Sequence, residues 1–284
     1  MNEQQLLPTI DPSENDLIER ALNTPFDKKV DQQIGFLKLF SGKRVVAGVS
    51  GGKDSEAIKG LLKMSGIEFE SEYNKTTIDP PELIYHLKEH HQDVKWNVSK
   101  HGHLILQRMV QKMSIPTRMG RWCCSEYKDC CSNDKSIGVV GVRIEESARR
   151  AGLWKQVTIH SKTGRTILAP IAYWTEQDVW RFIKENNIPY CSLYDEGFSR
   201  LGCVGCPLNN KAQAIEFKRW PKFEAMWKKG IDMVWERGQK VMTPSGRKYA
   251  AAKFESPDAL WNWWITGQKE DTTNCVFEEM MENV

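Results

Sequence analysis

Residues 44–62 read RVVAGVSGGKDSEAIKGLL and contain the signal that decides the fold. Residues 44–49 form a short, valine-rich run, which predicts a strand. A glycine-rich turn, SGGKDS at residues 50–55, comes next. Apolar residues then recur at the spacing of one helix face, namely Ala57, Ile58, Leu61 and Leu62. The predicted order is therefore strand, glycine loop and helix.

The glycine loop has the chemistry of a phosphate site. In a parallel α/β sheet, ligands bind at the carboxyl ends of the strands, where a helix N-terminus presents backbone N–H groups to an anion. Two glycines allow a close backbone approach, two serines add hydroxyl donors, and a lysine adds positive charge. The candidate nucleotide-binding residues of the loop are Ser50, Gly51, Gly52, Lys53, Asp54 and Ser55. The spacing fits neither G-x-x-x-x-G-K-[ST] nor G-x-G-x-x-G, and the alternative is a plain turn that Asp54 caps.

The order of strand and helix repeats along the chain. Further strands are expected at residues 67–73, 94–98, 137–142 and 167–171, and a further helix at residues 104–113. Thr175 and Asp178 predict a capping box at the start of a helix over residues 176–185. Strands separated by helices imply right-handed crossovers between parallel strands. The predicted fold is therefore α/β, with a doubly wound, mostly parallel sheet.

Composition divides the chain into three parts. We expect a helical lead-in over residues 1–40, an α/β nucleotide-binding domain over residues 41–208 and a mainly helical C-terminal part over residues 209–284. Residues 209–253 hold eleven Lys and Arg against four Asp and Glu, interleaved with aromatic residues, whereas residues 254–284 hold one Lys and seven acids. The basic block suits a nucleic-acid partner, because aromatic rings stack on bases while cations meet phosphates. Its alternative is an aromatic core with a solvated cationic face.

The overall composition excludes several classes of protein. The 284 residues carry a formal net charge of +3 and are 40% hydrophobic, which excludes a polybasic coat protein and disfavours disorder. No apolar run approaches the length of a membrane span, and the first residues lack the cationic and apolar regions of a signal peptide. We therefore expect a cytoplasmic protein without membrane attachment. In that reducing compartment, eight cysteines favour metal ligands or reactive thiols over disulfides.

Four of the cysteines form a pattern typical of a metal site. An adjacent pair is followed about eighty positions later by Cys-x-x-Cys, and the four are Cys123, Cys124, Cys203 and Cys206. Four thiolates suit an iron–sulfur cluster or a structural Zn²⁺ ion, and free thiols are the remaining alternative. Two Cys-x-x-Cys turns are expected in a zinc ribbon, so the adjacent pair favours iron. A second adjacent pair, Cys130 and Cys131, is placed outside the ligand set.

The SGGKDS loop after a hydrophobic strand resembles the PP-loop of the ATP pyrophosphatases and of the phosphoadenosine phosphosulfate (PAPS) reductase family. Further motifs agree with that family in order between residues 44 and 207. Residues 141–150 resemble its G-x-R-x-x-E-S-x-x-R segment, and residues 174–180 resemble its W-T-x-x-D-V-W signature. Residues 76–82 take the place of the family's D-T-G and P-E-T loop, but the aspartate and glycine are not matched.

The resemblance implies an adenine nucleotide at the loop, which is either ATP or a sulfonucleotide such as adenylylsulfate (APS) or PAPS. Arg143 and Arg150 follow a predicted strand, where guanidinium groups can clamp phosphate or sulfate. Thr77 and Ser147 complete the expected nucleotide site. The Cys-Cys and Cys-x-x-Cys pattern resembles the [4Fe-4S] motif of APS reductases and of DNA-phosphorothioation enzymes, with Zn²⁺ as the alternative.

The first expected function is an ATP pyrophosphatase that prepares an acceptor for sulfur. Lys53 and the loop N–H groups would stabilise the leaving pyrophosphate, with Mg²⁺ bridging its oxygens and Arg143 or Arg150 assisting. The adenylated acceptor, for which a nucleic acid is a candidate, would then receive sulfur from a sulfur donor.

Two alternatives remain open. In an APS or PAPS reductase, Cys275 would attack the sulfonucleotide and a thioredoxin-like partner would supply electrons. No neighbouring cation activates Cys275, and Glu278 and Glu279 oppose its thiolate form. The other alternative is a nucleic-acid or partner-binding module with a degenerate loop, which would bind no nucleotide.

Overall fold

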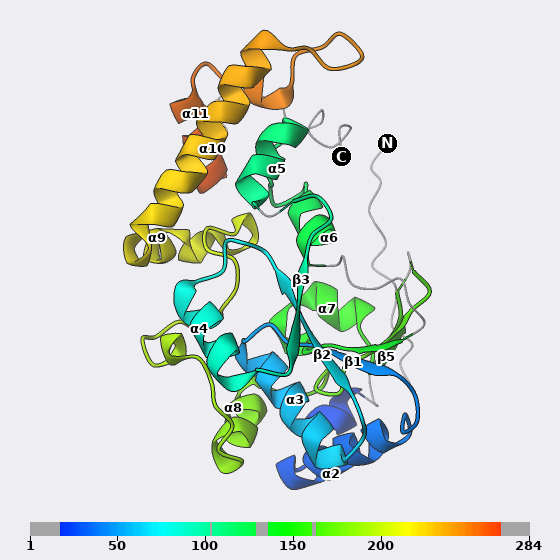
Figure 1. Cartoon of the computed structure of the whole chain (residues 1–284). Helices are drawn as coiled ribbons and strands as arrows, with labels where there is room; N and C mark the ends of the chain where they lie inside the picture. The colour runs from blue at the N-terminus through cyan, green and yellow to red at the C-terminus, as the bar shows by residue number, and fades with distance from the viewer. Residues whose placement is uncertain (1–17, 103, 129–135, 161–162, 268–284) are drawn as a thin grey trace. The chain divides into compact units, whose positions relative to one another are not determined.

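The computed structural model describes residues 18–102, 104–128, 136–160 and 163–267 (Figure 1). The chain forms two compact units that are interleaved in the sequence. The first unit comprises residues 1–73, 82–96 and 132–201, and the second comprises residues 74–81, 97–131 and 202–284. Across the described ranges, no helix has both the length and the apolar character needed to cross a membrane.

A six-stranded sheet with the order β3-β2-β1-β4-β6-β5 forms the centre of the first unit. The strands are β1 (Val45–Gly48), β2 (Glu70–Lys75), β3 (Val94–Val98), β4 (Ile137–Val139), β5 (Val157–Ile159) and β6 (Thr166–Leu168). β1 pairs in parallel with β2 and β4, β4 pairs in parallel with β6, and β5 pairs antiparallel with β6. The predicted α/β fold with a mostly parallel sheet is confirmed. Since β1 has a strand on each side, the loop that follows it lies at the middle of the sheet edge.

Helices pack around the sheet of the first unit, and α2 and α8 both contact α3 (Figure 1). They are α2 (Phe26–Lys38), α3 (Lys53–Ser65), α4 (Pro81–His90), α7 (Ala148–Leu153) and α8 (Glu176–Glu185), with short 3-10 turns η1 (Ile144–Glu146) and η2 (Ser192–Tyr194). Val45 of β1, Leu61 of α3 and Phe182 of α8 are almost completely buried in one apolar core. This core fixes where β1 ends and where α3 begins.

The second unit is helical, and α5 lies along α10 (Figure 1). Its elements are α5 (Ile105–Lys112), α6 (Trp122–Tyr127), η3 (Pro207–Asn209), α9 (Asn210–Arg219), α10 (Pro221–Lys240), η4 (Ala250–Lys253) and α11 (Pro257–Thr266). The ring centroids of Trp227 and Trp264 lie 4.9 Å apart, and those of Trp261 and Trp264 lie 5.5 Å apart. Indole rings in tilted contact therefore form much of this core, and the prediction of a helical C-terminal part is confirmed.

Several elements differ from the sequence-based expectations: the strands predicted at residues 67–73, 137–142 and 167–171 form β2, β4 and β6 with other bounds. β5 was not predicted, because Val157 and Ile159 are exposed and its three residues show no apolar alternation toward a core. The second unit takes residues 97–131 as well as the C-terminal part, because α5 packs on α10, and contacts between residues so far apart leave no local sign in the sequence. The predicted boundaries near residues 40 and 208 stay a prediction.

Candidate functional site

The glycine loop joins the carboxyl end of β1 to the first turn of α3. Gly51 has a φ of +76°, in the left-handed region that residues with a Cβ rarely adopt. A Cβ at this position would lie 2.7 Å from Leu83 Cδ1 on α4. Gly51 therefore permits a tight turn that brings backbone N–H groups to the positive end of the α3 dipole, where an anion is stabilised.

Two serines of the loop have different surroundings. The Ser50 N–H donates to Ser55 Oγ at 3.1 Å, and the Ser55 hydroxyl donates to the Gly52 carbonyl oxygen at 2.8 Å. Ser55 is buried, so its hydroxyl maintains the shape of the loop, whereas Ser50 is exposed and accessible to a ligand.

Lys53 is anchored behind the loop. Its buried ammonium group donates to the Ser199 carbonyl oxygen at 2.9 Å and lies 3.3 Å from Glu176 Oε1. Its backbone N–H donates to the Tyr194 hydroxyl at 2.8 Å. Burial raises the pKa of Tyr194, so this phenol stays protonated at neutral pH. Tyr194 and Ser199 were not predicted as site residues, because their contacts with Lys53 join segments far apart in the sequence.

Asp54 is oriented by Arg143, which follows β4. Arg143 Nε donates to Asp54 Oδ1 at 2.6 Å, and its Nη1 donates to Glu145 Oε2 at 2.5 Å. Burial alone would lower the pKa of Arg143, but Asp54 and the neighbouring Glu146 and Glu145 raise it overall. The structure therefore joins the loop to the G-x-R-x-x-E segment by an ion pair with a buried guanidinium. It places Arg143 as a partner of Asp54, where the sequence suggested a clamp for phosphate.

The remaining predicted nucleotide-binding residues have structural contacts of their own. Arg150 forms an ion pair with Glu146 four residues earlier, and Ser147 Oγ caps α7 by accepting from the Arg150 N–H at 3.3 Å. Thr77 belongs to the second unit, has a φ of 71°, and accepts a hydrogen bond from the Ile105 N–H at 3.1 Å. A nucleotide role for these residues stays a prediction.

The four predicted metal ligands come together in the second unit. Cys123 and Cys124 lie in α6, Cys203 and Cys206 precede η3, and none of the four is in a disulfide. All four line one small cavity, whose other walls are mainly apolar and include Ile78, Ile105, Pro116, Pro207 and Trp227. The hydrogen bond from the Cys123 thiol lowers the pKa of Cys124 to about 5, with help from Lys128 and Arg121 against burial.

Lys128 lies beside the cysteine cavity, and its positive charge favours the thiolate form of Cys203. Burial raises the pKa of Cys203 to about 11, and Lys128 opposes that shift. In return Cys203, together with Asp79, Cys124 and Cys206, raises the pKa of Lys128. Sequence reasoning missed Lys128, although it follows Cys124 by one helical turn. Four free cysteines surround one mainly apolar cavity, and Lys128 lies beside them. This arrangement fits an iron–sulfur cluster or a metal cation that thiolates bind.

The turn that carries Cys203 and Cys206 is tightly held. Gly205 has a φ of +73°, and a Cβ there would lie 2.7 Å from Trp227 Nε1. The Gly205 N–H donates to Glu216 Oε2 at 2.7 Å, and its carbonyl oxygen accepts from Gln213 Nε2 at 3.0 Å. Trp227 Nε1 donates to the Val204 carbonyl oxygen at 2.9 Å. Helices α9 and α10 therefore position these two cysteines.

The basic block over residues 209–253 buries three of its aromatic residues, while Phe223, Trp235 and Tyr249 are partly exposed. Phe217, Trp220 and Trp227 are buried in the helical core, whereas Lys222, Lys228 and Lys229 are exposed. The alternative of an aromatic core with a cationic face therefore describes these side chains. Cys130, Cys131 and Cys275 lie outside the described residues.

A buried polar network, which the sequence did not predict, lies behind the loop between α3 and α4. Lys59 donates to His91 Nδ1 at 2.8 Å and to Asp93 Oδ1 at 2.7 Å. Since a lysine ammonium can only donate, His91 Nε2 carries the proton that it shares with Glu56 Oε1 at 2.8 Å. His86 Nε2 lies 3.1 Å from the same oxygen. The ligand atoms of Glu56, His86 and His91 lie within 4.8 Å of one another, but these hydrogen bonds satisfy them without a metal.

A family model described as the phosphoadenosine phosphosulfate reductase domain matches residues 44–209. An uncharacterized protein from Methanocaldococcus jannaschii is 27% identical over 264 residues, which cover 87% of this chain and 52% of that protein. An adenosine 5'-phosphosulfate reductase from Oceanobacillus iheyensis is 27% identical over 130 residues, which cover 44% of this chain and 50% of that enzyme. The chain therefore spans about half the length of these relatives.

Among solved structures, a phosphoadenylyl-sulfate (PAPS) reductase from Candida auris aligns with a TM-score of 0.49 at 12% sequence identity. The alignment covers 69% of this chain and 96% of that structure.

Proposed function

Because the chain belongs to the phosphoadenosine phosphosulfate reductase domain family, we propose that it is an enzyme of sulfur chemistry that uses ATP to adenylate an acceptor. The acceptor oxygen attacks the α-phosphorus of ATP, the bond from that phosphorus to the bridging oxygen breaks, and pyrophosphate leaves. The products are AMP-linked acceptor and pyrophosphate, and later attack by a sulfur nucleophile displaces AMP. A nucleic acid is our candidate acceptor.

The observation that carries this proposal is the loop at the N-terminus of α3, with Asp54 held by Arg143 at 2.6 Å. The loop N–H groups and the helix dipole face the region where negative charge gathers on the leaving group. Lys53, whose buried ammonium group is held by Ser199 and Glu176, adds positive charge near the N-terminus of α3. Asp54 would be the residue that holds a Mg²⁺ ion, since carboxylate oxygens are the ligands that Mg²⁺ prefers, and the ion would supply positive charge to the phosphates.

In this proposal Cys123, Cys124, Cys203 and Cys206 hold a [4Fe-4S] cluster, with Zn²⁺ as the alternative. When bound, such a cluster supplies structural support or an iron site that carries sulfur. The apolar walls of the cysteine cavity exclude water, Lys128 offsets negative charge on the thiolates, and the turn at Gly205 keeps two of the sulfurs in place.

The test is turnover of ATP to AMP and pyrophosphate by anaerobically purified protein. We expect Asp54→Asn to lower turnover about a hundredfold or more, because it removes the metal-binding charge and weakens the pairing with Arg143. The matched control is Asp31→Asn on the exposed face of α2, which should leave turnover unchanged. Absence of pyrophosphate release with every acceptor class tried, while ATP binds, contradicts adenylation.

The alternative is a sulfonucleotide reductase, which the relatives named adenosine 5'-phosphosulfate reductase favour. It predicts sulfite release from APS or PAPS with thioredoxin as the electron donor, and loss of that activity in Cys275→Ser. ATP turnover that survives Cys275→Ser, without sulfite release, excludes the reductase. Failure of both nucleotide classes to bind would favour the binding module.

A further inference from the structure

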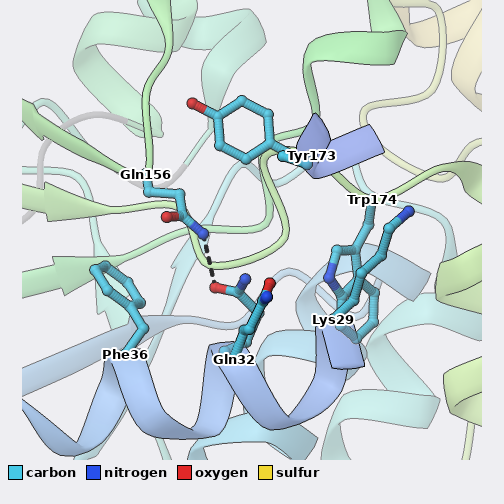
Figure 2. Close-up of a pocket in the computed structure, with 8 residues that line it drawn as sticks. Lys29, Gln32, Phe36, Gln156, Tyr173 and Trp174 are labelled. Atoms are coloured by element: carbon cyan, nitrogen blue, oxygen red, sulfur yellow. Dashed lines mark hydrogen bonds between the residues drawn. The ribbon is translucent and has the colours of Figure 1, made fainter. Parts of the chain in front are cut away.

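A polar cavity of about 430 Å³ lies in the first unit between α2 and two segments of the sheet edge (Figure 2). On one side, Lys29, Gln32, Gln33 and Phe36 share one face of α2, because they are spaced at three and four residues. On the other side lie Tyr173 and Trp174, which follow β6, and Gln156, which precedes β5. We call this the α2 cavity, and it shares no lining residue with the glycine loop.

Trp174 leaves a hydrogen-bond donor without a partner in this cavity. The side chain is 1% exposed, and its Nε1 is a buried polar atom with no hydrogen-bond partner among the described residues. The ring itself is fixed by edge contacts with Phe26 and Phe182, at centroid distances of 5.8 Å and 5.3 Å. Figure 2 shows the indole nitrogen turned toward the glutamines of α2. A buried donor without an acceptor is unfavourable, and a ligand with an acceptor atom would satisfy it.

The positive charge of Lys29 in the wall of the α2 cavity is neutralised by an ion pair with Asp178. The buried ammonium of Lys29 lies 2.7 Å from Asp178 Oδ2, so it is paired within the protein. The other groups of the wall are carboxamides, a phenol and aromatic rings, none of which carries a charge. An anion such as phosphate would find no unpaired cation on these walls, and the cavity is therefore suited to a neutral ligand.

The carboxamides supply both donors and acceptors in fixed positions. Gln156 Nε2 donates to Gln33 Oε1 at 2.8 Å, which orients the two amides across the cavity (Figure 2). This bond leaves Gln33 Nε2 as a donor and Gln156 Oε1 as an acceptor. Gln32 is exposed at the mouth and Phe36 adds an apolar ring face. Amide edges beside aromatic rings match a planar heterocycle that carries ring nitrogens and carbonyl or amino groups.

We propose that the α2 cavity binds a neutral planar heterocycle of nucleobase or nucleoside size, which accepts a hydrogen bond from Trp174 Nε1. The ligand edge pairs with the glutamine amides and its ring packs against the aromatic side chains. The site is separate from the glycine loop, so it does not depend on the activity proposed above.

The experiment follows the indole N–H resonance of Trp174 by NMR on the full chain during titration with adenosine, guanosine, cytidine and uridine. Loss of one resonance in Trp174→Phe assigns the signal. If Trp174→Phe does not fold, the Trp174 signal is assigned as the indole resonance that shifts in both Gln32→Leu and Gln156→Leu. We expect at least one nucleoside to shift the resonance in a saturable way.

The variants define what supports and what overturns the proposal. Gln32→Leu should weaken nucleoside binding by about tenfold, whereas Gln111→Leu, an exposed glutamine on α5, should not change it. A resonance that no nucleoside shifts means that the cavity holds water only. An equal shift of the Trp174 resonance by glucose or inorganic phosphate also overturns the proposal. So does nucleoside binding that neither shifts this resonance nor weakens in Gln32→Leu.

Discussion

Glu56 places a negative charge in the core of the first unit, directly after the glycine loop in the first turn of α3. Burial alone would raise the pKa of this carboxyl, but hydrogen bonds from His86 and His91 outweigh burial and lower it below its usual value. Lys59 closes the network from the other side of His91. The buried carboxylate of Glu56 thus connects α3 to α4. Helix α4 also packs against the loop at Gly51.

We expect this network to make stability depend on acid pH. A carboxyl whose pKa is lowered in the folded state contributes stability above its unfolded pKa, near 4.5, and this contribution is lost as the pH falls through the folded value. Glu56→Gln should cost about 2 kcal/mol at neutral pH and flatten the loss of stability below pH 4.5. Urea unfolding across this pH range measures both effects.

Glu68→Gln is the control for Glu56→Gln, because Glu68 is exposed on the same unit. A pH dependence below 4.5 that is the same in Glu56→Gln and in the unchanged protein would contradict the role given to the buried carboxylate.

At the scale of elements, α8 shows how local chemistry sets a boundary. The Thr175 hydroxyl accepts from the Asp178 N–H at 3.1 Å, and Asp178 Oδ2 accepts from the Thr175 N–H at 2.9 Å. The same Asp178 also binds Lys29 of α2. The capping box therefore starts the helix and also connects it to its neighbour.

Thr175→Ala should lower the free energy of unfolding by about 1 kcal/mol, because one N–H at the start of α8 loses its acceptor. Thr24→Ala removes a hydroxyl that only donates to the Arg20 carbonyl oxygen, so it should cost less than half as much. Thermal unfolding of the two variants compares them directly. Equal losses of unfolding free energy in Thr175→Ala and Thr24→Ala would mean that the Thr175 cap contributes no more than an ordinary hydroxyl hydrogen bond.

The α8 bounds could be predicted from sequence because the cap and the apolar spacing are local signals. The strand at residues 94–98 was predicted for the same reason, and it forms β3. β5 was not found, since an exposed three-residue strand exists only through its pairing with β6. The loop residues and the four cysteines were identified from their motifs, whereas Tyr194, Lys128 and the Glu56 network depend on contacts between distant segments.

At the scale of the whole molecule, the basic block connects to function only through its lysines. Phe217, Trp220 and Trp227 are buried and cannot stack on bases, so we expect binding of single-stranded nucleic acid to rest mainly on phosphate contacts. We expect that binding to be independent of base sequence, to weaken steeply with salt, and to weaken further in a Lys222→Glu, Lys229→Glu double variant. Fluorescence anisotropy at several salt concentrations measures it, with Lys63→Glu on α3 as the control. Binding without salt dependence would exclude this surface.

The cysteine cavity predicts a metal dependence of the second unit. Cys203→Ser should lower the iron or zinc content and reduce the stability of this unit by several kcal/mol, on the order of a structural metal site. Cys191→Ser is the control, because Cys191 is buried in the first unit and lies outside the cavity. Metal analysis together with thermal unfolding tests the prediction. Unchanged metal content in Cys203→Ser would contradict it.

The interleaving of the two units also determines when the second one can be completed during synthesis. Cys123 and Cys124 leave the ribosome about eighty residues before Cys203, which at 5–20 residues per second means roughly 4 to 16 seconds. During that interval α5 and α6 lack α10, against which α5 packs. The first two sulfurs are therefore exposed to the cellular thiol pool before their partners exist, and the cavity is completed only after Cys203, Cys206 and α10 have been synthesised.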